Sequence, residues 1–228
     1  MSKMIKVYDN FLPDYFANSI EKLHTSDLID WKLLSSTVSN EYDKNGNQSV
    51  FYNSKEWIDT PQFTHVFYGT DVGHSAYITE VENTLKHLDI NSEDLFIHRI
   101  KSNLNVHWVK KYNKENYQPP HKDLTHPQFQ SLLYYVNDTD GDTYFFDDDL
   151  KIVNKVSPKK NRAILFPSNM IHAGSNPMKN KLRIVINFIF STEKVDAVKT
   201  YYKLGDADKA MFQNMGDIIK DFQLGEKV

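Results

Sequence analysis

The feature that most constrains the fold is a nine-residue run, Leu182 to Phe190, in which all but two side chains are apolar. Alternate side chains of a strand point to opposite faces. One face then carries Leu182, Ile184, Ile186, Phe188 and Phe190, and the other carries Arg183, Val185, Asn187 and Ile189. The first face belongs in a core, and so apolar a strand leaves little of its second face in water. This pattern predicts a strand that is buried on both sides.

Other runs in the second half of the chain have the same character. We expect strands at Leu95–Val109, Phe129–Val136, Thr143–Phe146 and Arg162–Phe166. The segment Asp138–Asp142 lies between two of these runs and is typical of a hairpin turn. The predicted fold class is mainly β with flanking helices, as an antiparallel sandwich or an open barrel.

The first part of the chain, about residues 1–94, is expected to support this β-domain. Ile5–Phe11 is predicted to be a short strand, and a helix is expected to begin at Pro13. The apolar face of that helix is predicted to hold Tyr15, Phe16, Ser19, Ile20 and Leu23. A second helix is expected from about Ala76 to Leu88 and a surface loop at Ser39–Gln48. In the tail, about 191–228, helices are expected around Val195–Lys203 and Asp208–Phe222.

Composition limits the classes of protein. With 228 residues, 40% of them hydrophobic, we expect one domain over residues 1–228. A net charge of -3 predicts no nucleic-acid partner, and no apolar stretch resembles a signal peptide or a membrane span. We therefore expect a soluble cytoplasmic protein without a membrane partner, and the oligomeric state stays open. The chain has no cysteine, so a metal site must be built from histidine and carboxylate.

Three residues have the composition of such a site. His121 and Asp123 are spaced as His-x-Asp, so in an extended segment both side chains point to one face, and His172 would reach them from another strand. Two imidazoles and one carboxylate are the ligands of a non-haem Fe(II) centre that keeps positions open for substrate and oxygen. An isolated His-x-Asp is more often a surface pair. His126 is a competing histidine, which we interpret as a surface or supporting group.

Arg183 is the second informative position. It is one of only three arginines, and it shares the less apolar face of its strand with Asn187. A guanidinium buried in a barrel needs an anion, and it forms a bidentate pair with a carboxylate. The sequence leaves two partners open, which are an acidic side chain of this chain and a bound dicarboxylate.

A series of motifs accompanies these residues in a fixed order. The series is Leu132-Leu133-Tyr134-Tyr135-Val136-Asn137, Asp140-Gly141-Asp142-Thr143, Ala163-Ile164-Leu165-Phe166-Pro167, His172-Ala173-Gly174 and Arg183. It resembles the prolyl 4-hydroxylase branch of the 2-oxoglutarate- and Fe(II)-dependent dioxygenases, including the small relatives of that branch in marine viruses. The resemblance spans roughly Leu95 to Phe190. Asp140-Gly141-Asp142-Thr143 stands where the family usually has Gly-Gly-Glu-Thr, and many prolyl hydroxylases have lysine at the position of Arg183.

The resemblance implies a double-stranded β-helix, also called a jelly-roll or cupin-like barrel. It further implies the cofactor Fe(II), the cosubstrates 2-oxoglutarate and O2, and ascorbate as a reductant. The matching iron ligands are His121, Asp123 and His172, which form the catalytic set. Residues matching cosubstrate contacts are Arg183 and Tyr135 for the C5 carboxylate, with Tyr112 and Asn187 as further polar contacts. The implied activity is hydroxylation of an unactivated C–H, prolyl 4-hydroxylase-like on a peptidyl proline, with release of succinate and CO2.

Three other interpretations remain open from the sequence. A small molecule or a nucleobase is the alternative substrate to a protein or peptide. A cupin-like module that binds metal without catalysis is the alternative to an enzyme. The acidic run Asp138–Asp149 suggests calcium, but the glycine comes at the fourth position of the run, whereas an EF-hand loop needs it at the sixth.

Overall fold

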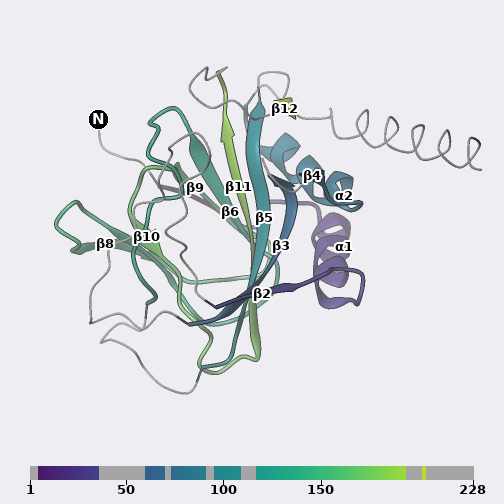
Figure 1. Cartoon of the computed structure of the whole chain (residues 1–228), viewed down its shortest axis with the longest axis horizontal. Helices are drawn as coiled ribbons and strands as arrows, with labels where there is room; N and C mark the ends of the chain where they lie inside the picture. Colours follow the sequence, from purple (N-terminus) through teal and green to yellow (C-terminus); the bar gives the residue numbers. More distant parts are fainter. Residues whose placement is uncertain are drawn as a thin grey trace, which may run out of the picture.

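The computed structural model describes residues 5–35, 60–69, 73–90, 95–108, 117–193 and 202–203. In these residues a large and a small antiparallel sheet pack against each other, and helices cover the outer face of the large sheet. Figure 1 shows α1 (Asp14–Thr25) and α2 (Ile78–Glu82) on one side of the large sheet and the small sheet on the other. This is the predicted class, mainly β with flanking helices.

The large sheet has nine strands within the described residues, and seven of them follow one path. Their order is β1 (Lys6–Tyr8), β9 (Arg162–Pro167), β6 (Gln130–Tyr135), β11 (Leu182–Ser191), β5 (Phe96–Val106), β3 (Gln62–Gly69) and β2 (Lys32–Leu34). The remaining two are β4 (Gly73–His74), which pairs with β3, and β12 (Tyr202–Lys203), which pairs with β5. The small sheet has the order β10 (His172–Ala173), β7 (Thr143–Phe146) and β8 (Ile152–Val156).

The central position of β11 confirms the prediction from its alternation. It pairs with β5 on one side and β6 on the other, and Asn187 lies opposite both Lys101 and Leu133. Ile186 and Phe188 face the helices in the larger core, whereas Val185 packs between the two sheets. Both faces are buried because helices cover one and the small sheet covers the other.

The helices lie where the sequence predicts them, with two differences. The segment predicted from Ala76 to Leu88 forms α2 and then a 3-10 helix, η1 (Asn83–His87). On α1, Tyr15 is 76% exposed although we predicted it on the buried face. The buried residues are Ala17, Ile20, Leu23 and His24, and Ser19 is exposed. The small Ala17 lets the helix approach the sheet on that side, and this packing decides which face is buried.

The prediction of a hairpin turn at Asp138–Asp142 is wrong. This segment leads from β6 in the large sheet to β7 in the small sheet, and these two strands do not pair. The carboxylate of Asp140 instead accepts hydrogen bonds from the backbone N–H groups of Met178, Lys179 and Asn180, at 2.7 to 3.2 Å. These contacts anchor the crossing between the sheets, so Asp140 has a structural role and the calcium interpretation finds no support in this segment.

Several expectations concern residues outside the described ranges. The predicted loop Ser39–Gln48 and the predicted helix Asp208–Phe222 lie there entirely, as does most of Val195–Lys203. Tyr202 and Lys203 are described, and they form β12 where we predicted helix. Within the part of the chain that the structure describes, no helix has the length and apolarity needed to cross a membrane.

His24 joins α1 to the sheet and makes a pH-dependent contribution to stability. Its Nδ1 lies 2.7 Å from the carbonyl oxygen of Ile20 and its Nε2 lies 2.8 Å from the hydroxyl of Ser102 on β5. Burial lowers the pKa of His24 to about 4. Because the unfolded chain then binds more protons than the folded chain below about pH 6.5, folding is favoured at neutral pH and weakened on acidification.

We expect the free energy of unfolding to fall between pH 7 and pH 5 by about 2 kcal/mol more in the wild type than in His24→Gln. Urea titrations at both pH values measure the difference. His87→Gln is the control, because His87 is exposed, and it should retain the wild-type pH dependence. Equal pH dependence in His24→Gln and the wild type would contradict this account.

Candidate active site

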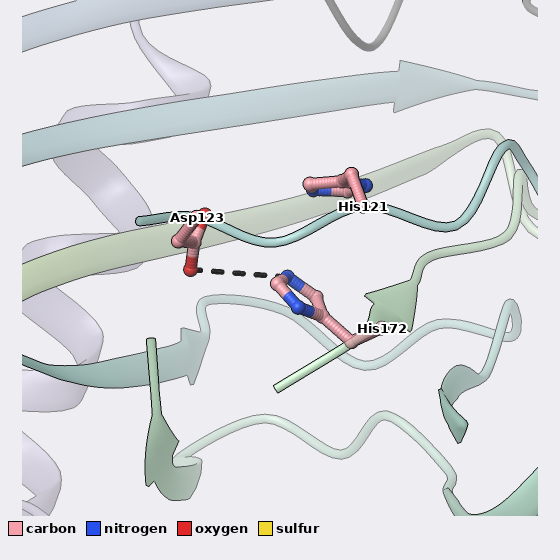
Figure 2. A group of neighbouring side chains, drawn as sticks. All are labelled: His121, Asp123 and His172. Atoms are coloured by element: carbon pink, nitrogen blue, oxygen red, sulfur yellow. Dashed lines mark ion pairs between the residues drawn. The ribbon is translucent and has the colours of Figure 1, made fainter. Parts of the chain in front are cut away.

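His121, Asp123 and His172 converge between the two sheets. His121 forms an isolated bridge with His172 of β10, and each residue's backbone N–H donates to the other's carbonyl oxygen at 2.9 Å. The segment of His121 and Asp123 thereby lies beside the small sheet without belonging to a regular strand. Figure 2 shows the three side chains pointing toward one another.

The ring nitrogens of both histidines suit metal binding. Nδ1 of His121 lies 3.2 Å from the carbonyl oxygen of Pro119, and Nδ1 of His172 lies 3.1 Å from that of Met170. A carbonyl only accepts hydrogen bonds, so each Nδ1 carries a proton, and Nε2 is the ring nitrogen left to bind a metal. Burial, followed by the nearby His172, lowers the pKa of His121 to about 3, which keeps its ring neutral.

The carboxylate of Asp123 is held by three strands of the large sheet. The hydroxyl of Ser131 on β6 donates to Oδ2 at 2.6 Å, and the amide of Asn187 on β11 donates to Oδ1 and Oδ2 at 3.0 and 3.1 Å. From β5, Nη2 of Arg99 lies 3.5 Å from Oδ1. Burial by itself raises the pKa of Asp123, but His172 and Arg99 hold it well below its usual range. The carboxylate is therefore ionised.

The donor set fits a divalent metal ion. One donor atom from each of the three residues lies within 4.8 Å of the others, and this is the one such group found among the described residues. The dashed line in Figure 2 joins Nε2 of His172 to Oδ2 of Asp123, which are 3.8 Å apart. This distance is too long for a hydrogen bond but suits two ligands of one ion. Two imidazoles and one carboxylate would leave further coordination positions open.

Arg183 is 3% exposed and lies in a second polar cluster, with Gly141, Thr143 and Tyr135. Its Nε donates to the carbonyl oxygen of Gly141 at 2.8 Å and its Nη2 to the hydroxyl of Thr143 at 2.9 Å. Tyr135 shares the same Thr143 hydroxyl at 2.6 Å, and the guanidinium carbon of Arg183 lies 5.5 Å from the Tyr135 ring centre. No acidic side chain in the described ranges lies within 4 Å of the guanidinium. Of the two partners left open by the sequence, these contacts favour a bound anion.

The remaining predicted residues have different positions. Asn187 contacts Asp123, so it supports the carboxylate of the triad. Tyr112 lies outside the described residues. His126 is half-buried beside the ring of Phe129 and is not part of the His121, Asp123 and His172 group.

Two cationic residues next to the site were missed by the sequence reasoning. Arg99 and Lys101 alternate along β5, and both influence the triad electrostatically. Burial, and then the adjacent Arg99, lowers the pKa of Lys101 to about 7. The signal that would have found them is the spacing of Arg99, Lys101, Asn103 and Asn105 at alternate positions of an otherwise apolar strand.

Comparisons with known proteins agree with this geometry. Residues 107–191 match the family model described as the 2OG-Fe(II) oxygenase superfamily, and this range includes the triad and Arg183. An oxidoreductase of the 2OG-Fe(II) oxygenase family from Burkholderia pseudomallei has a TM-score of 0.55 and 9% identity, over 83% of this chain and 86% of that chain. No curated protein sequence matches this chain.

Two further solved structures are similar over most of their length. A prolyl-4-hydroxylase from Pseudomonas putida has a TM-score of 0.49 and 11% identity, over 85% of this chain and 95% of that chain. HygX from Streptomyces hygroscopicus, with nickel, 2-oxoglutarate and hygromycin B bound, has a TM-score of 0.47 and 10% identity, over 89% of this chain and 93% of that chain.

The fold is therefore the double-stranded β-helix that the motifs implied. The family model agrees with the motif resemblance at the level of the 2OG-Fe(II) oxygenase superfamily, over residues 107–191 of the chain. The chain is accordingly identified as an enzyme, an oxygenase that uses Fe(II) and 2-oxoglutarate.

The polar cluster around Arg183 depends on the backbone conformation of Gly141. This glycine has a φ of 103°, and an added Cβ would lie 2.7 Å from the backbone oxygen of Ser175. We expect Gly141→Ala to reduce the free energy of unfolding by about 1–3 kcal/mol, since both the backbone and the contact are strained. Urea titration measures this loss. Gly174→Ala is the control, because its added Cβ would meet its nearest neighbour, Nη1 of Arg183, at an ordinary 3.4 Å. Equal stability losses in the two variants would refute the argument.

Proposed function

We propose that His121, Asp123 and His172 bind Fe(II), and that Arg183 with Tyr135 binds the C5 carboxylate of 2-oxoglutarate. The observation that carries this proposal is the convergence of two free Nε2 atoms and an ionised carboxylate next to a buried arginine without an acidic partner among the described residues. Burial raises the pKa of Tyr135, against the effect of Arg183, so its hydroxyl stays protonated and can donate to a carboxylate.

The proposed reaction is the hydroxylation of an unactivated C–H, in which O2 and 2-oxoglutarate are consumed and succinate and CO2 are released. When bound, Fe(II) supplies the oxygen-activating chemistry. The protein's residues supply position and charge: Arg183 fixes one end of the cosubstrate, and Asn187 and Ser131 fix the orientation of Asp123. The apolar residues between the sheets, such as Phe145 and Val185, keep water from the reacting atoms.

For the substrate, we propose a peptidyl proline, which rests on the resemblance of the motif series to the prolyl 4-hydroxylase branch. Ascorbate is proposed as the reductant on the same ground. A small molecule is the second candidate, and one observation favours it: the cations Arg99 and Lys101 lie beside the triad, where they suit a compact charged substrate.

The first experiment measures binding and turnover of the purified protein. We expect calorimetry to show binding of Fe(II) under anaerobic conditions, followed by binding of 2-oxoglutarate. His172→Ala should lose the metal, whereas Arg183→Met should retain the metal and bind 2-oxoglutarate at least tenfold more weakly, because a charge-assisted pair is lost. Succinate should form in the wild type with Fe(II) and ascorbate, and a proline-rich peptide should increase its rate.

The outcomes of this experiment separate the parts of the proposal. Loss of metal in His172→Ala without any effect of Arg183→Met would remove Arg183 from the cosubstrate site. If a proline-rich peptide does not change the rate of succinate formation, the proposal that the substrate is a peptidyl proline would be contradicted. A wild-type protein that binds neither Fe(II) nor 2-oxoglutarate would overturn the assignment of the site.

Asn187 offers a test of how the triad is oriented. Asn187→Leu removes both amide hydrogen bonds to Asp123 at similar side-chain size, so we expect the metal affinity to fall by about 10-fold or more. Calorimetry with Ni(II) measures the affinity without turnover. Asn154→Leu on the exposed strand β8 is the control and should bind Ni(II) like the wild type. An unchanged affinity in Asn187→Leu would show that Asp123 needs no support from β11.

A further inference from the structure

The inner face of β5 carries two cations that the proposed reaction does not use. Lys101 lies opposite Asn187 and Arg99 lies opposite Ile189 in the pairing with β11. Residues directly opposite each other in an antiparallel pair share a face. Arg99 and Lys101 therefore face the space between the sheets, as Asn187 does where it contacts Asp123.

The two cations have one carboxylate partner between them among the described residues. Arg99 has one carboxylate within 4 Å, that of Asp123, and its buried Nε has no hydrogen-bond partner. Lys101 forms no hydrogen bond or ion pair with any described residue, and its charge acts on Arg99, Asp123 and His121. Both side chains are half-buried, and two adjacent cations that share one carboxylate repel each other.

Bound Fe(II) and 2-oxoglutarate would not offset the positive charge of Arg99 and Lys101. Fe(II) carries two positive charges and 2-oxoglutarate carries two negative charges, so together they leave the balance unchanged. Among the described residues, Arg99 and Lys101 then share the carboxylate of Asp123, whereas Arg183 lies apart with Gly141 and Thr143. The loaded site retains an excess of positive charge, and an anionic group on the remaining ligand would offset it.

Arg99 and Lys101 also lie far along the sheet from Arg183, the residue proposed to bind the cosubstrate. Arg183 lies opposite Asn105, which is four residues from Lys101 and six from Arg99 along β5. At ~3.3 Å per residue these distances are roughly 13 and 20 Å. The polar cluster around Arg183 and the two cations thus lie at opposite ends of the site. Asp123 lies at the same end as Arg99.

We propose that Arg99 and Lys101 form an anion subsite for the substrate that is hydroxylated, so that this substrate carries a carboxylate or phosphate group close to the oxidised C–H, as the small-molecule candidate above can and a peptidyl proline by itself does not. The inference rests on the proposed function for the location of the metal and the cosubstrate. A guanidinium beside an ammonium binds the oxygens of either group through charge-assisted hydrogen bonds. An acidic group held there would position the substrate on the side of the metal away from Arg183.

The test measures binding of two probe anions to protein loaded with Ni(II) and 2-oxoglutarate, in which no turnover occurs. Sulfate represents a phosphate group and acetate represents a carboxylate. We expect at least one of these anions to bind the wild type. The same anion should bind Lys101→Met at least tenfold more weakly, and it should bind Lys101→Arg as tightly as the wild type. Lys32→Met is the matched control, because Lys32 is exposed on the edge strand β2, and it should leave anion binding unchanged.

Each result bears on one claim. If neither anion binds the wild type, or if Lys101→Met binds them equally well, the anion subsite is refuted. If Lys101→Met weakens 2-oxoglutarate as much as Arg183→Met does, Lys101 belongs to the cosubstrate site and the inference is also refuted. A wild type that fails to bind Ni(II) and 2-oxoglutarate contradicts the proposed function instead, and sulfate titration of the metal-free protein then still tests the two cations.

Discussion

The burial of β11 on both faces is the constraint on which the rest of the structure depends. One face packs against the helices through Ile186 and Phe188, and the other packs between the two sheets through Val185. Because the second face is covered, Arg183 and Asn187 are desolvated and need partners inside the protein. Arg183 finds Gly141 and Thr143, and Asn187 finds Asp123. One strand therefore connects the core to both polar parts of the site.

The two sheets contribute different parts of the triad. The histidines are joined by backbone hydrogen bonds beside the small sheet, whereas Asp123 is held by side chains from the large sheet. The site therefore requires the correct packing of one sheet on the other. Asp140 contributes to this packing, because it anchors the crossing from β6 to β7 on the backbone at Met178–Asn180.

Much of this could be predicted from residues whose pattern is local. The strands at β5, β6, β7, β9 and β11 follow from alternation and apolar runs, and His-x-Asp with a distal histidine indicated the metal site. The errors arise where long-range packing decides. Tyr15 has the periodicity of a buried residue but is exposed, and Asp138–Asp142 has the composition of a hairpin turn but links two sheets. Strand β8, whose first four residues are exposed, has no apolar pattern to predict it.

The sequence by itself determined the central strand, the identity of the candidate metal ligands and the resemblance to the oxygenase superfamily, because spacing and motif order are properties of the chain. Only the tertiary structure decided that Asn187 supports Asp123 and that Arg183 lacks an acidic partner among the described residues. It also placed Arg99 and Lys101 beside the triad. Strand pairing brings together residues more than 60 positions apart in the chain, and their charges and hydrogen bonds become coupled only when that pairing excludes water.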